Sequence, residues 1–197
     1  MFKETYSIGI LTVEWEPPSM SKTDTFFIRA TLDCQNVNPG PANTFNQIPI
    51  DLGTYVNALE KSVLRIKSIQ VAFSDGYGTS STIIATSVGV CQYQLTTQSQ
   101  DASVLASNNS VIGSGRVHLT NQLAANGLAT IVSDMNDLAP NNFGTDGYLV
   151  AVDTIFLGGQ ASTGFVGDAH VSVILECQVE TLTTSKAMAL ALSQQGA

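Results

Sequence analysis

The sequence predicts an all-β fold with about eight strands, and three observations support this. Apolar and polar residues alternate over His170–Glu180 and over Thr25–Asp33, which is the pattern of strands with one buried face. Further runs are rich in β-branched and small residues. Stretches crowded with Gly, Asn, Pro, Asp and Ser separate these runs and supply turn conformations. Together these features predict a sandwich, a jelly roll or a barrel.

The remaining strands follow from the same patterns. Within Val63–Phe73 the apolar positions move from even to odd numbers, and a bulge near Lys67 or Ser68 would produce this shift. The segments Ser81–Leu95 and Gly147–Leu157 are predicted to be strands buried on two sides or nearly so. Weaker strand patterns occupy Tyr6–Trp15, Val111–Leu119 and Leu128–Ser133.

Two segments are predicted to be helical. Asp51 can cap a short helix that ends at Leu59, just before the strand that starts at residue 63. Near the C-terminus, Thr184 or Ser185 precedes Lys186–Leu192, a run of good helix formers. This second helix has no charged face, so we expect it either to fray or to dock on another surface.

The length and composition favour one domain with a surface suited to association. The chain has 197 residues, a comfortable size for one all-β domain, and we expect that domain at 1–182 with a helical or flexible tail at 183–197. Only 12% of the residues are charged, against about a quarter in ordinary proteins. An uncharged surface loses little solvation when it associates, so we expect contacts with copies of the same chain.

The charge distribution argues against nucleic-acid binding. The formal net charge is −8, and Lys61, Arg65 and Lys67 form the nearest approach to a basic patch. These three cations are too sparse to neutralise a run of phosphates. Residues 1–20 lack a basic start followed by an apolar stretch, and no run approaches the ~18 apolar residues of a membrane span, so we expect a soluble protein.

The three cysteines are predicted to be buried free thiols. Cys34, Cys91 and Cys177 are widely spaced, and each lies in a strand-like run. An odd number allows at most one disulfide, and no close Cys or His pair suggests a zinc site.

No set of residues indicates catalysis, a cofactor or a metal. The two histidines, His118 and His170, lack convincing catalytic neighbours in the sequence, and we interpret them as strand-edge or loop residues. Two carboxylate pairs have suitable spacing, Glu14 with Glu16 and Glu176 with Glu180. Residues two or four apart lie on one face of a strand, as on any solvent-facing edge, so we predict no paired-carboxylate site.

One loop is rich in oxygen-bearing side chains, and calcium binding there is left open. Its candidate ligands are Asp134, Asn136, Asp137, Asn141, Asn142 and Asp146. Hard cations favour such ligands, but the spacing does not match an EF-hand loop. A polar loop whose Asn and Asp residues serve turn geometry is the preferred interpretation.

The order of elements resembles a known family. A proline-containing loop at Ile48–Leu52 is followed by the short helix, the long strand Val63–Phe73 and a Gly-rich turn, and the late strand Val171–Leu182 runs into the tail Lys186–Gln195. This layout resembles small single jelly-roll viral capsid proteins. The resemblance implies eight antiparallel strands in two sheets and a structural role in a virion.

The N-terminal segment indicates which kind of capsid protein the chain resembles. Capsid proteins that pack naked genomes usually carry a basic N-terminal arm, whereas residues 1–16 contain one Lys and three Glu. The chain is in this respect similar to capsid subunits of icosahedral viruses with an internal membrane. That resemblance implies a shell that rests on lipid or on other coat proteins.

Two functions of different classes are therefore expected. The first is a capsid or coat subunit that self-assembles through protein–protein interfaces; the alternative is a non-catalytic carbohydrate- or receptor-binding module of a surface or fibre protein. Trp15 is the only tryptophan and the five tyrosines are scattered, which weakens the sugar-binding alternative. We expect assembly contacts at Tyr6–Trp15, at Asn136–Asp146 and at Lys186–Leu192. Deleting the tail should harm assembly more than folding.

Overall fold

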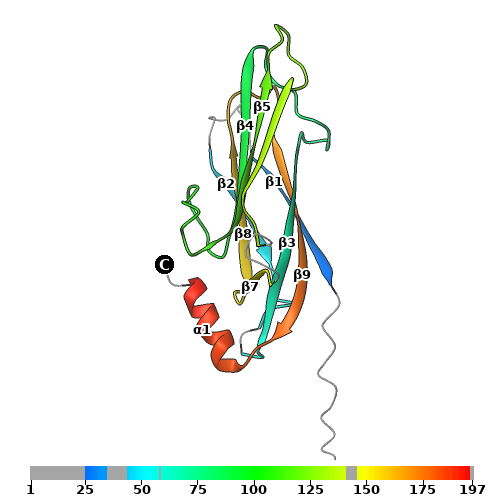
Figure 1. The fold of residues 1–197 in the computed structure, drawn as a ribbon. Coiled ribbons are helices and arrows are strands. Elements are labelled where there is room, and N and C mark those ends of the chain that lie inside the picture. The colour runs from blue at the N-terminus through cyan, green and yellow to red at the C-terminus, as the bar shows by residue number, and fades with distance from the viewer. Residues whose placement is uncertain (1–24, 35–43, 58, 141–145, 196–197) are drawn as a thin grey trace, which may run out of the picture.

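The computed structural model describes residues 25–34, 44–57, 59–140 and 146–195. These residues form nine strands and one helix, in the order shown in Figure 1. The elements are β1 (Phe26–Asp33), β2 (Asn46–Asp51), β3 (Ser62–Ser74), β4 (Ser87–Thr96), β5 (Val111–Asn121), β6 (Ile131–Leu138), β7 (Tyr148–Val150), β8 (Thr154–Ala161), β9 (His170–Thr181) and α1 (Thr184–Gln195).

The strands form two antiparallel sheets that pack face to face. One sheet has the order β1-β9-β3-β7 and the other β2-β8-β4-β5-β6. Strands from the two halves of the chain pair with each other: β1 with β9, β2 with β8, and β3 with β7, around the β4–β5 hairpin. This is a long hairpin rolled into two sheets, the single jelly roll, so the predicted fold class is confirmed. The strand β6 is an addition outside this eight-strand pattern.

The core lies between the two sheets. Leu64 and Leu175 from one sheet and Leu95 and Leu157 from the other are fully buried. Each such side chain contributes about 1.5–3 kcal/mol of transfer free energy relative to leaving it exposed. Alternation along β9 places its odd-numbered apolar residues in this core.

The bulge predicted from the shifted apolar pattern is confirmed. In the β3–β9 ladder, Ile66 pairs with Cys177 and Ser68 pairs with Glu176, so Lys67 is the extra residue. The extra residue changes which positions of β3 point inward, and Leu64, Ile66 and Ile69 can all be buried.

Two strands predicted from continuous apolar runs are wrong in extent. The run Gly147–Leu157 contains β7 and β8, which belong to different sheets. Ala151 and Val152 between them are buried because the chain crosses from one sheet to the other there. In the run Ser81–Leu95, β4 begins only at Ser87.

The predicted helix from Asp51 to Leu59 is also wrong. The proline-containing segment before it is the strand β2, in which Pro49 is tolerated because β2 is an edge strand. After β2 the described residues make one turn, closed by the amide of Val56 donating to the carbonyl of Leu52 at 2.9 Å. Asp51 does accept a hydrogen bond, from the amide of Gly53 at 2.8 Å, but it caps a turn.

The predicted C-terminal helix is confirmed as α1, and it is docked. Of the three weaker strands, β5 and β6 correspond to two, although β6 starts three residues later than predicted and runs to Leu138. The third, Tyr6–Trp15, lies outside the described residues. Among the described residues, no helix is long and apolar enough to cross a bilayer.

All three cysteines are free and buried, as predicted. A hydrogen bond with Cys91 and burial together raise the pKa of the Cys34 thiol. Burial raises the pKa of Cys177 to about 12.

We therefore expect no cysteine to react with a thiol reagent at pH 8 in the native protein. The thiolate is the reactive form, and burial shields all three thiols from the reagent, while the raised pKa values of Cys34 and Cys177 also oppose thiolate formation there. Ellman's reagent should count three thiols in denaturant and none before unfolding. A count of one in denaturant would contradict this assignment and indicate a disulfide.

Candidate interaction surfaces and a polar pocket

The edge strand β6 exposes apolar side chains on both of its faces. Ile131 is 50% exposed, Val132 62% and Met135 46%. Among the described residues, β6 pairs only with β5, so the backbone amide and carbonyl groups along its other edge are unpaired. Edge strands usually carry charges or prolines that discourage further pairing. Across residues 131–135, Asp134 is the single charge.

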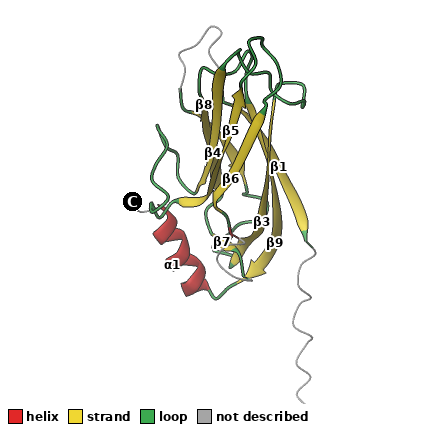
Figure 2. Ribbon diagram, turned by 45° about the horizontal axis from the view of Figure 1, so that its top comes forward, coloured by secondary structure: helices red, strands yellow, loops and turns green. Residues whose placement is uncertain are grey.

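An apolar groove opens beside this edge. The strand β7 has three residues and pairs only with Leu64–Ile66, so no other strand of the described ranges covers the outer edge of β3 from Ser68 to Ser74. The groove has a volume of about 350 Å³. Its apolar lining comes from both sheets and includes Val71, Phe73, Val117, Leu119, Leu128 and Val132. Figure 2 shows β6 beside β5 at the margin of the sandwich.

The helix α1 docks at the end of the molecule near β7 (Figure 1). The buried side chain of Gln194 accepts a hydrogen bond from the Ala151 amide at 2.9 Å and donates one to the Leu149 carbonyl at 2.7 Å. These bonds satisfy backbone groups at the crossing between the sheets. The outward face of the helix exposes Met188 and Leu192.

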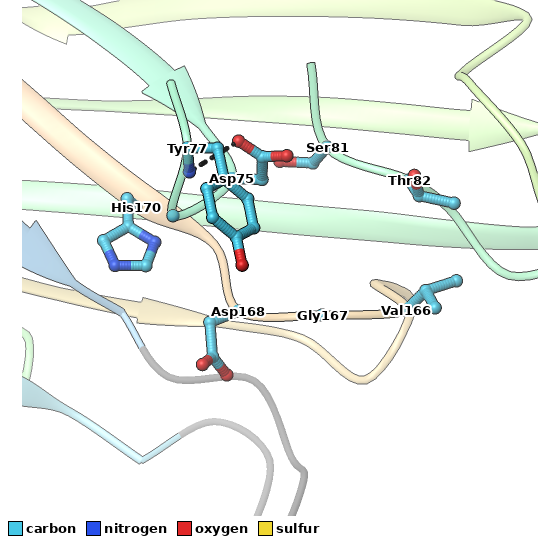
Figure 3. Close-up of a pocket in the computed structure, with 9 residues that line it drawn as sticks. Asp75, Tyr77, Ser81, Thr82, Val166, Gly167, Asp168 and His170 are labelled. Atoms are coloured by element: carbon cyan, nitrogen blue, oxygen red, sulfur yellow. Dashed lines mark hydrogen bonds between the residues drawn. The ribbon is translucent and has the colours of Figure 1, made fainter. Parts of the chain in front are cut away.

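A polar pocket of about 530 Å³ lies where the β3–β4 and β8–β9 loops meet. Figure 3 shows Tyr77 and Asp75 from the first loop opposite Asp168 from the second, with His170 beside them. Ser81 and Thr82 add hydroxyl groups to the lining. The pocket therefore offers two carboxylates, hydroxyls and an aromatic ring.

The turn Asp75–Thr79 fixes the position of Tyr77. The Asp75 carboxylate accepts hydrogen bonds from the amides of Tyr77 and Thr79 at 2.9 and 2.8 Å, and from the Thr79 hydroxyl at 2.6 Å. These bonds, chiefly those from Thr79, lower the pKa of Asp75. Gly78 has φ +79°, a left-handed conformation that glycine adopts without strain. The turn leaves the side chain of Tyr77 94% exposed.

His170 begins β9 and lies against this turn. Its Nε2 atom is 3.9 Å from the carboxylate of Asp33, and its Nδ1 atom has no hydrogen-bond partner in the described part of the chain. Gly76 makes room for the ring, because a Cβ there would lie 3.3 Å from the imidazole.

The carboxylates suggested by sequence spacing are not brought together as a pair. Glu180 forms an ion pair with Arg65, which raises the pKa of that guanidinium, and Glu176 accepts a hydrogen bond from Ser68 at 2.8 Å. His118 lies on β5, in the opposite sheet from His170. The pair Glu14 and Glu16 lies outside the described residues.

The oxygen-rich segment is divided between a strand and a turn. Asp134 lies on β6 and Asp146 in the turn before β7, while Asn141 and Asn142 fall outside the described residues. No group of three His, Cys, Asp or Glu residues suited to a metal occurs in the described ranges. Calcium binding in 134–146 stays an open prediction.

Sequence reasoning missed the groove and the pocket. The groove arises from the shortness of β7, which its apolar sequence concealed. The pocket could have been sought at Asp75–Gly78, where Asp and two glycines around an aromatic residue predict a tight turn that displays a ring.

Comparisons with known proteins give only distant likenesses. No family model matches the chain, and no curated protein sequence does. Similar solved structures include VP1 of trichodysplasia spinulosa-associated polyomavirus with GM1 oligosaccharide, at TM-score 0.46 and 8% identity, covering 83% of this chain and 97% of that one. Another is the unassembled VP1 pentamer of Merkel cell polyomavirus, at TM-score 0.39 and 10% identity, covering 81% and 99%. Likeness at this level assigns neither family nor function.

Proposed function

We propose that this protein is a structural coat subunit that assembles into the icosahedral shell of a virion through protein–protein interfaces. The observation that carries the proposal is the outer edge of β6, which pairs with no strand in the described part of the chain and lies beside the exposed Ile131, Val132 and Met135. An apolar strand edge of this kind can pair with a strand of another chain, and assembly would cover it. The rolled sandwich supplies a rigid body for such contacts.

The low charge of the surface supports the same proposal and suggests the partners. Copies of this chain, other coat proteins and an internal viral membrane are the proposed partners, and nucleic acid is not, because the chain has no cluster of cations. We propose a non-catalytic role. The division into a domain at 1–182 and a tail at 183–197 is likewise part of the proposal, with the exposed Met188 and Leu192 of α1 as a second contact.

The mass of the purified protein in solution tests the proposal. Light scattering coupled to size exclusion, over a range of protein and salt concentrations, should reveal rings, pentamers, hexamers or shells, and electron microscopy should show their form. A protein that stays monomeric under all conditions, with added lipid vesicles included, would contradict it.

A second candidate function is a saccharide-binding module, and the polar pocket favours it. An exposed aromatic ring beside carboxylate and hydroxyl acceptors is an arrangement that binds neutral sugars, which stack on the ring and donate hydroxyl hydrogens. Asp75 and Asp168 would repel an anionic sugar. This candidate is compatible with the first, because a coat can also bind a receptor.

Replacing Tyr77 with alanine is expected to weaken binding of any neutral glycan found in a screen by about tenfold, or ~1.4 kcal/mol. The ring is exposed, so the fold should not change. Titration calorimetry would measure the affinity. Phe27→Ala is a matched control, since Phe27 is an exposed aromatic residue on β1 outside the pocket. Equal affinity in both variants would contradict a stacking role for Tyr77.

A further inference from the structure

We propose that residues 6–15 of a neighbouring copy enter the apolar groove as an added strand and pair with the free edge of β3. This inference rests on the proposed assembly and names one of its interfaces. It would complete the half of the sandwich that the short strand β7 leaves open.

The free edge of β3 has the length that a docking strand needs. Within the described residues, no strand pairs with Ser68–Ser74 on the side away from β9. Seven residues of extended chain span about 23 Å at roughly 3.3 Å per residue. An added strand there would continue the line of β7, and its main-chain hydrogen bonds would supply affinity, as in other cases of strand addition to a sheet edge.

The residues on the opposite wall of the groove require an inserted strand to have an apolar face. Val117 and Leu119 on β5 and Val132 on β6 line the groove opposite Val71 and Phe73 of β3. Asp134 on β6 also lines the groove, so a strand inserted here must present apolar side chains to the facing sheet and add no second negative charge on that side. Burying an unpaired charge at this point would cost several kcal/mol.

Residues 6–15 meet these requirements. The segment reads as a strand, and its ten residues would extend over about 33 Å. In a strand, Tyr6, Ile8 and Ile10 would share one face, and residues 6–12, which match the seven residues of the free edge, carry no charge. Pairing of β6 with a second β6 is a poorer alternative, because it would bring two copies of Asp134 together without a cation in Ile131–Leu138.

A neighbouring copy is a better donor than the same chain. The segment joins the domain through β1, at the opposite end of its sheet from the free edge of β3, with β9 between them. Pro17 and Pro18 follow the segment after Glu16, and consecutive prolines favour an extended backbone. An extended segment before β1 would lead away from its own domain. To enter the groove of the same chain, residues 6–15 would have to turn back across the sheet from β1 to β3.

Photo-crosslinking in the full chain tests this interface. Val132 is replaced with benzoylphenylalanine, which the exposed position should tolerate, and this protein is co-assembled with ¹⁵N-labelled unmodified chain. Irradiation should give a covalent dimer on a denaturing gel. Mass spectrometry should locate the crosslink between residue 132 of the photo-reactive chain and residues 6–15 of the ¹⁵N-labelled chain. The same photo-residue at Leu105, an exposed loop position outside the groove, is the control and should not reach this segment.

Charge substitutions on the segment give a second measurement. Ile10→Asp should reduce the dimer yield at least tenfold, whereas Ser7→Asp, which adds the same charge on the other face, should retain most of it. Assembled particles whose crosslinks map to another segment, or only within one chain, would overturn the inference and leave the proposed assembly intact. A protein that never assembles would overturn both.

Discussion

Replacing Val132 with glutamate is expected to weaken assembly strongly and leave the fold intact. Val132 is mostly exposed on an edge strand, so the free energy of unfolding should change by no more than about 0.5 kcal/mol. In an interface that covers β6, the new carboxylate would be buried beside Asp134 without a cation. The protein concentration needed for assembly should rise about a hundredfold, or ~2.7 kcal/mol per contact.

Light scattering across a dilution series would measure this change. Leu105→Glu is the matched control, because it adds the same charge at an exposed apolar residue that lies between β4 and β5 and does not line the groove. Both variants should unfold at the urea concentration of the unmodified protein. Assembly of the Val132 variant at the unmodified concentration would show that β6 is not an interface.

Replacing Gln194 with alanine is expected to lower the free energy of unfolding by about 2–4 kcal/mol. The buried Gln194 side chain satisfies the Ala151 amide and the Leu149 carbonyl, and its removal leaves both without these partners. An unsatisfied buried polar group costs about 1–3 kcal/mol. Urea unfolding would measure the loss, and Gln195→Ala, at the exposed neighbouring residue, should be close to neutral.

The Gln194 result would also bear on the expectation that deleting the C-terminal tail harms assembly more than folding. Ala187 packs with Val63 and Ala151 in a small apolar cluster, and Gln194 bonds to the chain next to β7. Removing 184–195 is therefore expected to cost stability as well as assembly. Leu192→Glu, on the exposed face of α1, separates the two effects, because it should impair assembly alone. If Gln194→Ala unfolds like the unmodified protein, the docking of α1 contributes little.

The sequence predicts the strands whose two faces differ. Alternation identifies β1 and β9, and the shift in apolar phase places the β3 bulge, because one side of each strand meets the core and the other meets water. It also predicts α1 from helix propensity and the free cysteines from their number and setting. The absence of basic clusters follows from composition alone.

Only the tertiary structure decided how the apolar runs are divided. Tyr148–Val150 and Thr154–Ala161 read as one strand because the residues between them are buried where the chain crosses the core. Asn46–Asp51 reads as a loop because Pro49 is compatible with a strand only at a sheet edge, and edges are set by pairing with distant residues. The same distant pairing leaves β7 short, opens the groove beside β6 and brings Tyr77 near Asp168. The local sequence determines which residues are apolar and are stabilised by burial. Long-range strand pairing determines which of these residues remain exposed and can contact a partner.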